Sequence, residues 1–210
     1  MDFPSYFKHS SSPIPQSNTP TLVSETRGLK TLARKIPSQR WEFNFSGFTL
    51  GYNCATGENE TLKFQGEFAS LAQGGFNIFD YKPNDMFLIN DALTIKLEET
   101  IPAKEDYFII SVSPKPESAS SIIGKMFRFS TETKVYMITS STLFGSTVDT
   151  GFYRVKINTG SRFSQNEDTN IISGPTMRIK LRLDGTIVKG TSPNPKFNKT
   201  MYQFRMVEVI

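Results

Sequence analysis

One short stretch of the chain sets apolar and polar side chains in strict alternation. Between residues 39 and 46, Trp41, Phe43 and Phe45 alternate with polar or charged residues. Successive side chains of a β-strand point to opposite faces, so this period of two predicts a strand with one buried face. The same period recurs along the chain, at residues 93–97, 127–129, 135–137, 153–157 and 177–183. The sequence therefore predicts a mainly β protein with one core around Trp41, Phe43 and Phe45. It predicts a second core around Phe127, Val135 and Met137.

Two further elements follow from local signals. Residues 59–73 predict the one helix, with Asn59 as N-cap and two glycines, Gly74 and Gly75, to end it before a strand at 76–81. Gly66 inside this helix weakens the prediction. The last residues, 202–210, begin as an alternating strand and then shift phase near Val207, which indicates a β-bulge or burial on both faces.

Composition divides the chain into segments. Residues 1–21 are rich in proline and serine and are expected to form an extended arm that buries little surface, either disordered or lying on a neighbouring subunit. Turn-forming residues gather at 82–92 and again at 159–175. Several short strands lie between these two breaks, enough for a small barrel of their own.

The bulk properties permit many roles and require none. The chain has 210 residues, of which 37% are hydrophobic and 21% charged, with a net charge of +4. That small excess permits an anionic partner without demanding one. A single cysteine excludes an internal disulfide framework, which fits assembly in a reducing cytoplasm. The N-terminal residues resemble no secretion signal, and apolar stretches such as 107–112 are too short to span a bilayer.

Residues with catalytic chemistry are sparse and scattered. The sole histidine, His9, lies in the expected arm, and Cys54 has no histidine partner in an ordered region. There is no cluster of ligands for zinc and no phosphate-binding glycine loop. Three pairs of neighbouring acids, at 98–99, 105–106 and 167–168, would point to opposite faces of a strand and so not share a cleft. We therefore expect no enzyme activity, no catalytic or metal site and no cofactor.

Basic residues follow the polar side of two predicted strands. Arg178, Lys180 and Arg182 lie on one, and Arg154 and Lys156 on the other. Beside surface aromatic rings, such a stripe would suit single-stranded nucleic acid. The other interpretation is the ordinary solvated face of an antiparallel sheet, which the nearly balanced acids favour.

Three segments, in this order, resemble the distal tail proteins of long-tailed bacteriophages, in particular a two-domain kind. The first is Ser-Gln-Arg-Trp-Glu-Phe at 38–43, followed by the predicted helix and a Gly-Phe strand. The second runs from 123 to 129 and on through Lys-Val-Tyr-Met-Ile-Thr at 134–139. The third is Gly-Pro-Thr-Met-Arg-Ile at 174–179. The resemblance covers residues 22 to about 185 loosely, and none of the three segments is a strict motif.

The resemblance implies a β-sandwich domain with one α-helix, interrupted by a small OB-like β-barrel inserted before its closing strands. On this chain the arm would be 1–21, the sandwich 22–88 and 165–210, and the barrel 89–164. It further implies a virion structural protein that forms a ring, usually of six copies. Such a ring joins the tail tube to the baseplate or fibre proteins that recognise the host, and DNA passes through its channel without specific binding. The protein would be made in the host bacterial cytoplasm.

Three features depart from that pattern: the Pro-rich arm, the strand after the helix, and the strongly strand-like segment 201–210. They leave open whether the ring belongs to a siphophage tail tip or a myophage baseplate. We expect the final strand to pack against the body or a neighbour. Two other functions stay open as alternatives. One is a single-stranded nucleic-acid-binding OB-type module, and the other is a carbohydrate-binding or wall-degrading tail component.

Overall fold

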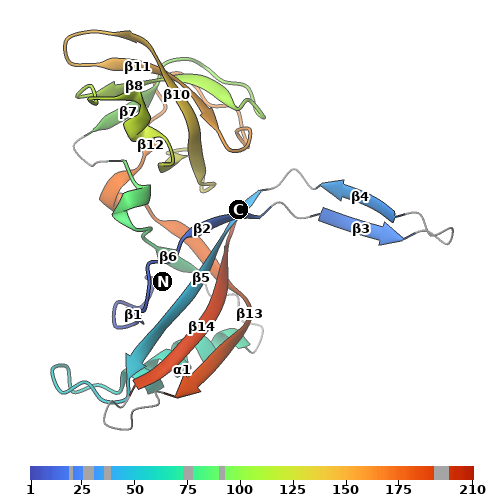
Figure 1. The fold of residues 1–210 in the computed structure, drawn as a ribbon, viewed down its shortest axis with the longest axis vertical. Coiled ribbons are helices and arrows are strands. Elements are labelled where there is room, and N and C mark those ends of the chain that lie inside the picture. Colours follow the sequence, from blue (N-terminus) through green and yellow to red (C-terminus); the bar gives the residue numbers. More distant parts are fainter. Residues whose placement is uncertain (19–20, 26–30, 36–38, 73–77, 90–92, 192–198) are drawn as a thin grey trace. The chain divides into compact units, whose positions relative to one another are not determined.

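The computed structural model describes residues 1–18, 21–25, 31–35, 39–72, 78–89, 93–191 and 199–210. The expected fold class is confirmed, because the chain is mainly β with one α-helix and contains a second, nearly closed barrel-like sheet. Contacts divide the chain into two compact units (Figure 1). Unit 1 is Met1–Tyr81 with Lys180–Ile210, and unit 2 is Lys82–Ile179. Unit 2 is thus inserted into the chain of unit 1.

The sheet of unit 1 is built around two long antiparallel strands, β5 and β14. Its strands are β1 (Lys8–His9), β2 (Pro15–Asn18), β5 (Arg40–Leu50), β6 (Phe79–Tyr81), β13 (Ile179–Thr191) and β14 (Lys199–Glu208). They follow the order β1-β5-β14-β13-β6, and β2 also pairs with β5. The register sets Phe43 opposite Met206 and Phe45 opposite Phe204. Since cross-strand partners share a face, the alternating apolar residues of both strands form one buried layer.

Helix α1 (Glu60–Ala72) covers that apolar layer (Figure 1). The predicted cap is present, because Asn59 Oδ1 accepts a hydrogen bond from the Leu62 amide at 3.0 Å. Phe64 packs against Tyr202 with ring centroids 4.4 Å apart, and Phe68 stacks on Phe79 at 4.9 Å. Two side chains one helical turn apart therefore attach α1 to β14 and to β6. Residues 73–77, where the sequence predicts the helix end and the start of a strand, lie outside the described residues.

Residues 1–18 pack against unit 1, which corrects the expectation of a loose arm. β1 and β2 pair with the outer edge of β5, and Asp2 forms a parallel bridge with Asp80 of β6. Phe7 is buried, with its ring stacked 5.3 Å from Phe64. Two phenylalanines are enough to anchor a segment that proline and serine otherwise make polar.

Aromatic contacts show that the sheet of unit 1 curls strongly. β5 lies near one end of the strand order and β6 at the other. Even so, Tyr81 of β6 lies 5.1 Å from Phe45 and 5.4 Å from Phe43, ring centroid to centroid. Phe3 fits between the two ends, 4.9 Å from Phe45 and 5.5 Å from Tyr81. The N-terminal segment therefore bridges both edges of the curled sheet, and burial there raises the pKa of Tyr81 to about 12.

Unit 2 is a small, strongly curved sheet of short strands. They are β7 (Thr94–Leu97), β8 (Tyr107–Ser113), β9 (Met126–Phe129), β10 (Tyr136–Ser146), β11 (Gly151–Ile157) and β12 (Ile171–Ile172), in the order β12-β9-β10-β11-β8-β7. The two end strands meet through a bridge between Lys96 and Asn170, and a second bridge joins Ile101 to Gln165. The sheet therefore nearly closes into a barrel, with Phe108, Phe127 and Phe129 packed inside.

The core residues chosen from the sequence are buried with one exception. Trp41, Phe43 and Phe45 are buried in unit 1, and Phe127 and Val135 in unit 2. Met137 is only half-buried, whereas its neighbours Tyr136 and Ile138 are buried. The predicted alternation has the wrong phase in β10, where Tyr136 and Ile138 face inwards. Val135 is buried as well because it lies just before the strand, in a run of consecutive buried residues from Lys134 to Tyr136.

The final strand is interior to the sheet of unit 1 and not at its periphery. β14 pairs with β5 on one side and β13 on the other. Met206, Val207 and Glu208 are all buried, so of the two explanations of the phase shift it is burial on both faces that the structure shows. The ladder from β14 to β5 continues without a register shift through this region.

Candidate functional site

The outer side of the barrel carries aromatic and basic side chains next to one another. Along β8 and β11 alternate residues are buried, which turns Tyr107, Arg154 and Lys156 outwards. The Arg154 guanidinium lies 5.0 Å from the ring centre of Phe144, and Lys156 Nζ lies 5.1 Å from that of Tyr107. We call these four residues the cation–aromatic face. The sequence predicted its two basic residues, and the structure adds the aromatic ones.

Electrostatics limit what this face can attract. Lys156 Nζ also lies 3.8 Å from an Asp106 carboxylate oxygen, which offsets its charge. Unit 2 contains as many Asp and Glu residues as Lys and Arg residues, so the whole positive excess of the chain belongs to unit 1. A neutral unit does not create the long-range positive potential that steers polyanions.

The second predicted basic stripe is divided between the two units. Arg178 belongs to unit 2, whereas Lys180 and Arg182 belong to unit 1. The Arg178 guanidinium donates hydrogen bonds to the backbone carbonyls of Pro175 and Met177, at 2.6 and 2.9 Å. Its charge therefore helps to hold the turn at η3 (Gly174–Thr176).

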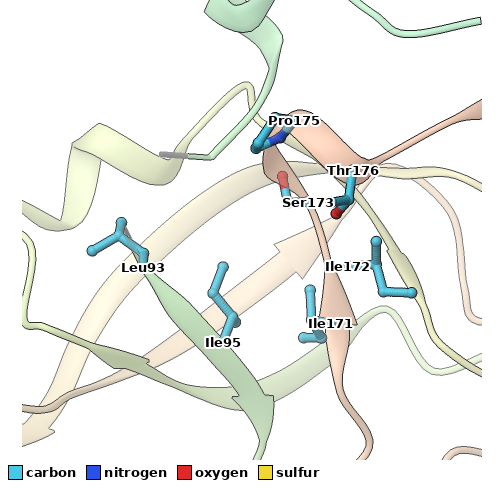
Figure 2. Close-up of a pocket in the computed structure, with 7 residues that line it drawn as sticks. All are labelled: Leu93, Ile95, Ile171, Ile172, Ser173, Pro175 and Thr176. Atoms are coloured by element: carbon cyan, nitrogen blue, oxygen red, sulfur yellow. The ribbon is translucent and has the colours of Figure 1, made fainter. Parts of the chain in front are cut away.

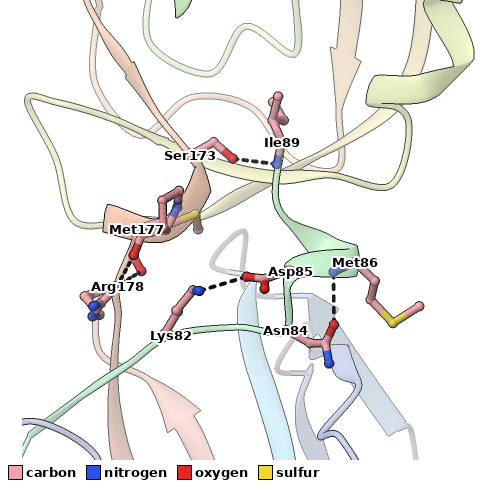
Figure 3. A network of polar contacts seen from close by, with 9 residues as sticks. Lys82, Asn84, Asp85, Met86, Ile89, Ser173, Met177 and Arg178 are labelled. Atoms are coloured by element: carbon pink, nitrogen blue, oxygen red, sulfur yellow. Dashed lines mark hydrogen bonds and ion pairs between the residues drawn. The ribbon is translucent and has the colours of Figure 1, made fainter. Parts of the chain in front are cut away.

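The two connecting segments at the ends of unit 2 are tied to the barrel by polar contacts (Figure 3). Ser173 Oγ accepts a hydrogen bond from the Ile89 amide at 3.0 Å and donates one to the Met126 carbonyl at 2.8 Å. Lys125 Nζ donates to the Met86 carbonyl at 2.8 Å. These bonds join both segments to the start of β9, which explains why unit 2 extends beyond the expected range of 89–164 at each end.

Described residues of unit 2 line two cavities, and neither brings reactive groups together. The first, of about 390 Å³, is lined mainly by the connecting segments, where Lys82 Nζ is paired with Asp85 at 2.8 Å. The second, of about 260 Å³, lies where β7 and β12 diverge, and Leu93, Ile95, Ile171 and Ile172 form its apolar walls (Figure 2). Only the Ser173 and Thr176 hydroxyls add polar side-chain groups there, and Ser173 is already engaged by Ile89 and Met126.

A buried polar cluster between β9 and β10 was not predicted from the sequence. Glu132 Oε1 accepts hydrogen bonds from the Tyr136 hydroxyl at 2.9 Å and from the Gln165 amide at 3.3 Å. The Tyr136 hydroxyl also accepts one from the Arg162 amide at 2.8 Å. Glu132, Tyr136 and Gln165 are all buried. Since they come from distant parts of the chain, the cluster fixes the 159–165 loop to the barrel wall.

His9 and Cys54 occupy sites that offer them no catalytic partner among the described residues. The His9 ring stacks on Phe3 at 5.7 Å and meets the edge of Phe7 at 5.1 Å, while the rest of its side chain reaches solvent. Partial desolvation by these rings lowers the pKa of His9. Cys54 is exposed in the loop before α1.

The paired acids mostly serve local structure. Glu99 accepts a hydrogen bond from the Ile109 amide at 2.9 Å, and Asp106 faces Lys156 as described above. Asp168 adopts a left-handed backbone conformation, with φ of 65°, at a tight turn. In the part of the chain that the structure covers, no three His, Cys, Asp or Glu side chains gather as a metal-binding set. No helix within the same ranges is long and apolar enough to cross a membrane.

Comparison with known proteins adds no identification. No family model matches the sequence. A search of curated proteins also finds no match. The function must therefore be argued from the fold and its surfaces.

Proposed function

We propose that the chain is a virion structural protein that forms a ring at the tail tip or baseplate of a long-tailed bacteriophage. In this role the ring joins the tail tube to the host-recognition proteins and leaves a channel for DNA, and the chain carries out no chemistry. The ring is expected to contain six copies and to assemble in the host cytoplasm.

The observation that carries this proposal is the insertion of the barrel. Unit 2 begins directly after β6, and the chain then returns to complete unit 1 with β13 and β14. A sheet domain with one helix, interrupted before its closing strands by a small barrel, is the plan that the resemblance to distal tail proteins implies. Fold alone does not determine function, so this support is one of architecture.

An unpaired hairpin adds a second, independent argument for assembly. β3 (Thr21–Glu25) and β4 (Thr31–Lys35) form a two-stranded sheet that joins no other described strand. An isolated hairpin is marginally stable in water at best. A contact with another chain would supply the missing stabilisation.

The test is the oligomeric state of the purified protein. We expect multi-angle light scattering to give a mass near six times the 23.7 kDa chain, and negative-stain electron microscopy to show closed rings. A chain that remains monomeric at concentrations of hundreds of micromolar, and that forms no ring with tail tube protein added, would refute the proposal.

The cation–aromatic face supports a second candidate, a module that binds single-stranded nucleic acid. Exposed rings beside Arg154 and Lys156 are the arrangement on which bases stack. The balanced charge of unit 2 opposes it. Fluorescence anisotropy with a labelled oligonucleotide distinguishes the two roles, because strand binding predicts an affinity that falls steeply as salt rises. The substitutions Arg154→Ala and Lys156→Ala should then weaken it, and the oligomeric state should not change.

A further inference from the structure

The larger cavity of unit 2 combines an apolar wall with charged side chains. Leu88 and Ile89 form the wall, and both are buried. Pro175 adds an apolar ring. Three charged residues also line the cavity, namely Lys82, Asp85 and Lys125. Its volume of about 390 Å³ lies within the range of sites that hold small molecules, roughly 300–1,000 Å³. We call it the lysine cavity.

The apolar wall of the lysine cavity is held in place by the protein itself. Leu88 forms a parallel bridge with Met126 of β9, and its amide donates a hydrogen bond to the Asp85 carbonyl at 3.0 Å. The Ile89 amide donates to Ser173 Oγ at 3.0 Å (Figure 3). Both backbone amides are therefore satisfied within the chain, and the wall does not depend on a ligand for its shape. A largely preformed wall of this kind is typical of small-molecule sites.

Both ammonium groups of the lysine cavity retain hydrogen-bonding capacity. Lys125 Nζ donates to the Met86 carbonyl at 2.8 Å, which uses one of the three N–H groups that a lysine carries. Lys82 Nζ lies 2.8 Å from an Asp85 carboxylate oxygen (Figure 3). The Asp85 side chain is 81% exposed, and an ion pair so open to water is weak. Each ammonium group can therefore bind a further oxygen atom.

The charges and the wall together define the ligand. Two lysines against one aspartate leave a single positive charge in the cavity. That charge matches a monoanion, whereas a dianion such as phosphate would also meet Asp85 and would gain nothing from the apolar wall. A carboxylate forms charge-assisted hydrogen bonds with ammonium groups, and an apolar body attached to it would cover Leu88 and Ile89.

We infer that the lysine cavity binds a carboxylate carried on a compact apolar body. The carboxylate lies against Lys82 and Lys125, and the body lies against Leu88, Ile89 and Pro175. The ligand is either a free carboxylic acid or the terminal residue of a polypeptide, which share this chemistry. This inference goes beyond the proposed ring function and is independent of it, because every residue that it uses belongs to unit 2 of one chain.

The first experiment is an NMR titration of the full chain with cyclohexanecarboxylate. Its binding should shift the amide signals of residues 82–89 and of Lys125. Three control compounds separate the contributions: the neutral cyclohexanecarboxamide, acetate and inorganic phosphate. The carboxamide should bind at least about tenfold more weakly, because it lacks the charge that strengthens hydrogen bonds to the two lysines. Acetate and phosphate should also bind more weakly, since neither carries an apolar body. Equal binding of acid and carboxamide, shifts confined to other parts of the chain, or no binding would each overturn the inference.

The second experiment changes the charges of the cavity. K82M and K125M keep an apolar side chain at each position and should each weaken binding of cyclohexanecarboxylate by about tenfold. K115M is the matched control, because Lys115 also donates one hydrogen bond, to Ser146 Oγ at 3.2 Å, but does not line the cavity. This variant should bind as the wild type does. Equal affinities of the three lysine variants would refute the assignment.

D85N provides a test that a damaged fold cannot mimic. Removing the negative charge of Asp85 should tighten the binding of cyclohexanecarboxylate by roughly fivefold, an effect that salt should reduce. Circular dichroism checks that all four variants are folded. An affinity that D85N leaves unchanged or lowers would contradict the role of charge in the cavity.

A final comparison distinguishes the two sources of the ligand. N-acetyl-leucine imitates the carboxyl end of a polypeptide, and N-acetyl-leucinamide is its uncharged counterpart. Tighter binding of N-acetyl-leucine than of cyclohexanecarboxylate supports a polypeptide end, and the reverse order supports a free acid. Light scattering of the same samples keeps the two proposals apart: a monomer that binds the acid would refute the ring and leave this inference standing, whereas a ring that binds neither acid would do the opposite.

Discussion

Gly47 should tolerate no side chain, because β1 passes directly over it. A Cβ atom at this position would lie 2.4 Å from the Lys8 carbonyl oxygen and 2.6 Å from the nearest ring atoms of Phe7. Both distances are below any normal carbon contact, and the closest atom is backbone, so G47A must displace the N-terminal segment. Phe7 is buried against Phe64 and Phe204, and it cannot move without exposing its ring.

The added methyl group of G47A can either be forced into the packed site or displace the N-terminal segment, and both outcomes lower the free energy of unfolding by similar amounts. Forcing an extra methyl group into a packed site costs about 1–3 kcal/mol. Releasing the segment instead exposes the Phe7 ring, at about 1.5–3 kcal/mol. The free energy of unfolding of unit 1 should therefore fall by about 1–3 kcal/mol, which for a domain of about 100 residues lowers the melting temperature by roughly 4–8 °C per kcal/mol.

Urea denaturation measures the loss of stability, and limited trypsin digestion identifies its place. The Lys8 backbone is held in the ladder with Phe48, so cleavage after Lys8 should accelerate in G47A alone. G66A is the matched control, because a Cβ atom added to this helical glycine would meet no atom within 4 Å. It should stabilise the protein by about 0.5–1 kcal/mol. An unchanged G47A protein, with Lys8 still protected from trypsin, would refute the docking of residues 1–18.

Three further predictions test other parts of the structure. The pKa of His9 is lowered in the folded protein, so folding favours its neutral form. The contribution of His9 to the free energy of unfolding should be fully present above the unfolded pKa of about 6.5 and should decline as pH falls below that value. H9F should remove this pH dependence, and NMR titration of the single imidazole measures its pKa directly. Y136F keeps the aromatic side chain but removes its hydrogen bonds to Glu132 and to the Arg162 amide. The free energy of unfolding of unit 2, measured by urea denaturation, should fall by about 1–3 kcal/mol. An unchanged value would show that the cluster does not hold the 159–165 loop. Deletion of 202–210 removes buried Tyr202, Phe204 and Met206 from an interior strand, and each lost side chain should lower the free energy of unfolding by about 1.5–3 kcal/mol. The near-ultraviolet circular dichroism signal of folded unit 1 should therefore disappear, and a folded deletion variant would contradict the position of β14.

The predictions from sequence succeed where one face of an element is buried and the other is wet. β5 is such a strand, and its alternation places Trp41, Phe43 and Phe45 in the core. The same holds for the helix, where Asn59 at the start accepts a local hydrogen bond from the Leu62 amide. In both cases the interactions that determine the element lie within a few residues or on a single periodic face, so they can be predicted from the local sequence pattern.

The predictions fail where burial is two-sided or depends on distant residues. Around Tyr136, consecutive residues from Lys134 to Tyr136 are buried, and a period of two cannot describe them. The cluster of Glu132, Tyr136 and Gln165 joins residues 33 positions apart, for which the sequence gives no local signal. The cation–aromatic face is only half predictable, because Arg154 and Lys156 share a strand while Phe144 and Tyr107 come from its neighbours.

The composition of the N-terminal segment predicts a loose arm, whereas the structure shows that this segment pairs with β5. Its prolines indicate a chain that cannot pair, yet Pro15 lies in β2, opposite Phe43, on the edge of the sheet. Proline is tolerated on an edge strand because its missing N–H group can face outwards, and there it also prevents a further strand from adding. The residues that weaken the segment as an independent element thus make it a suitable end to the sheet. It follows that unit 1 covers this edge of its sheet with its own chain.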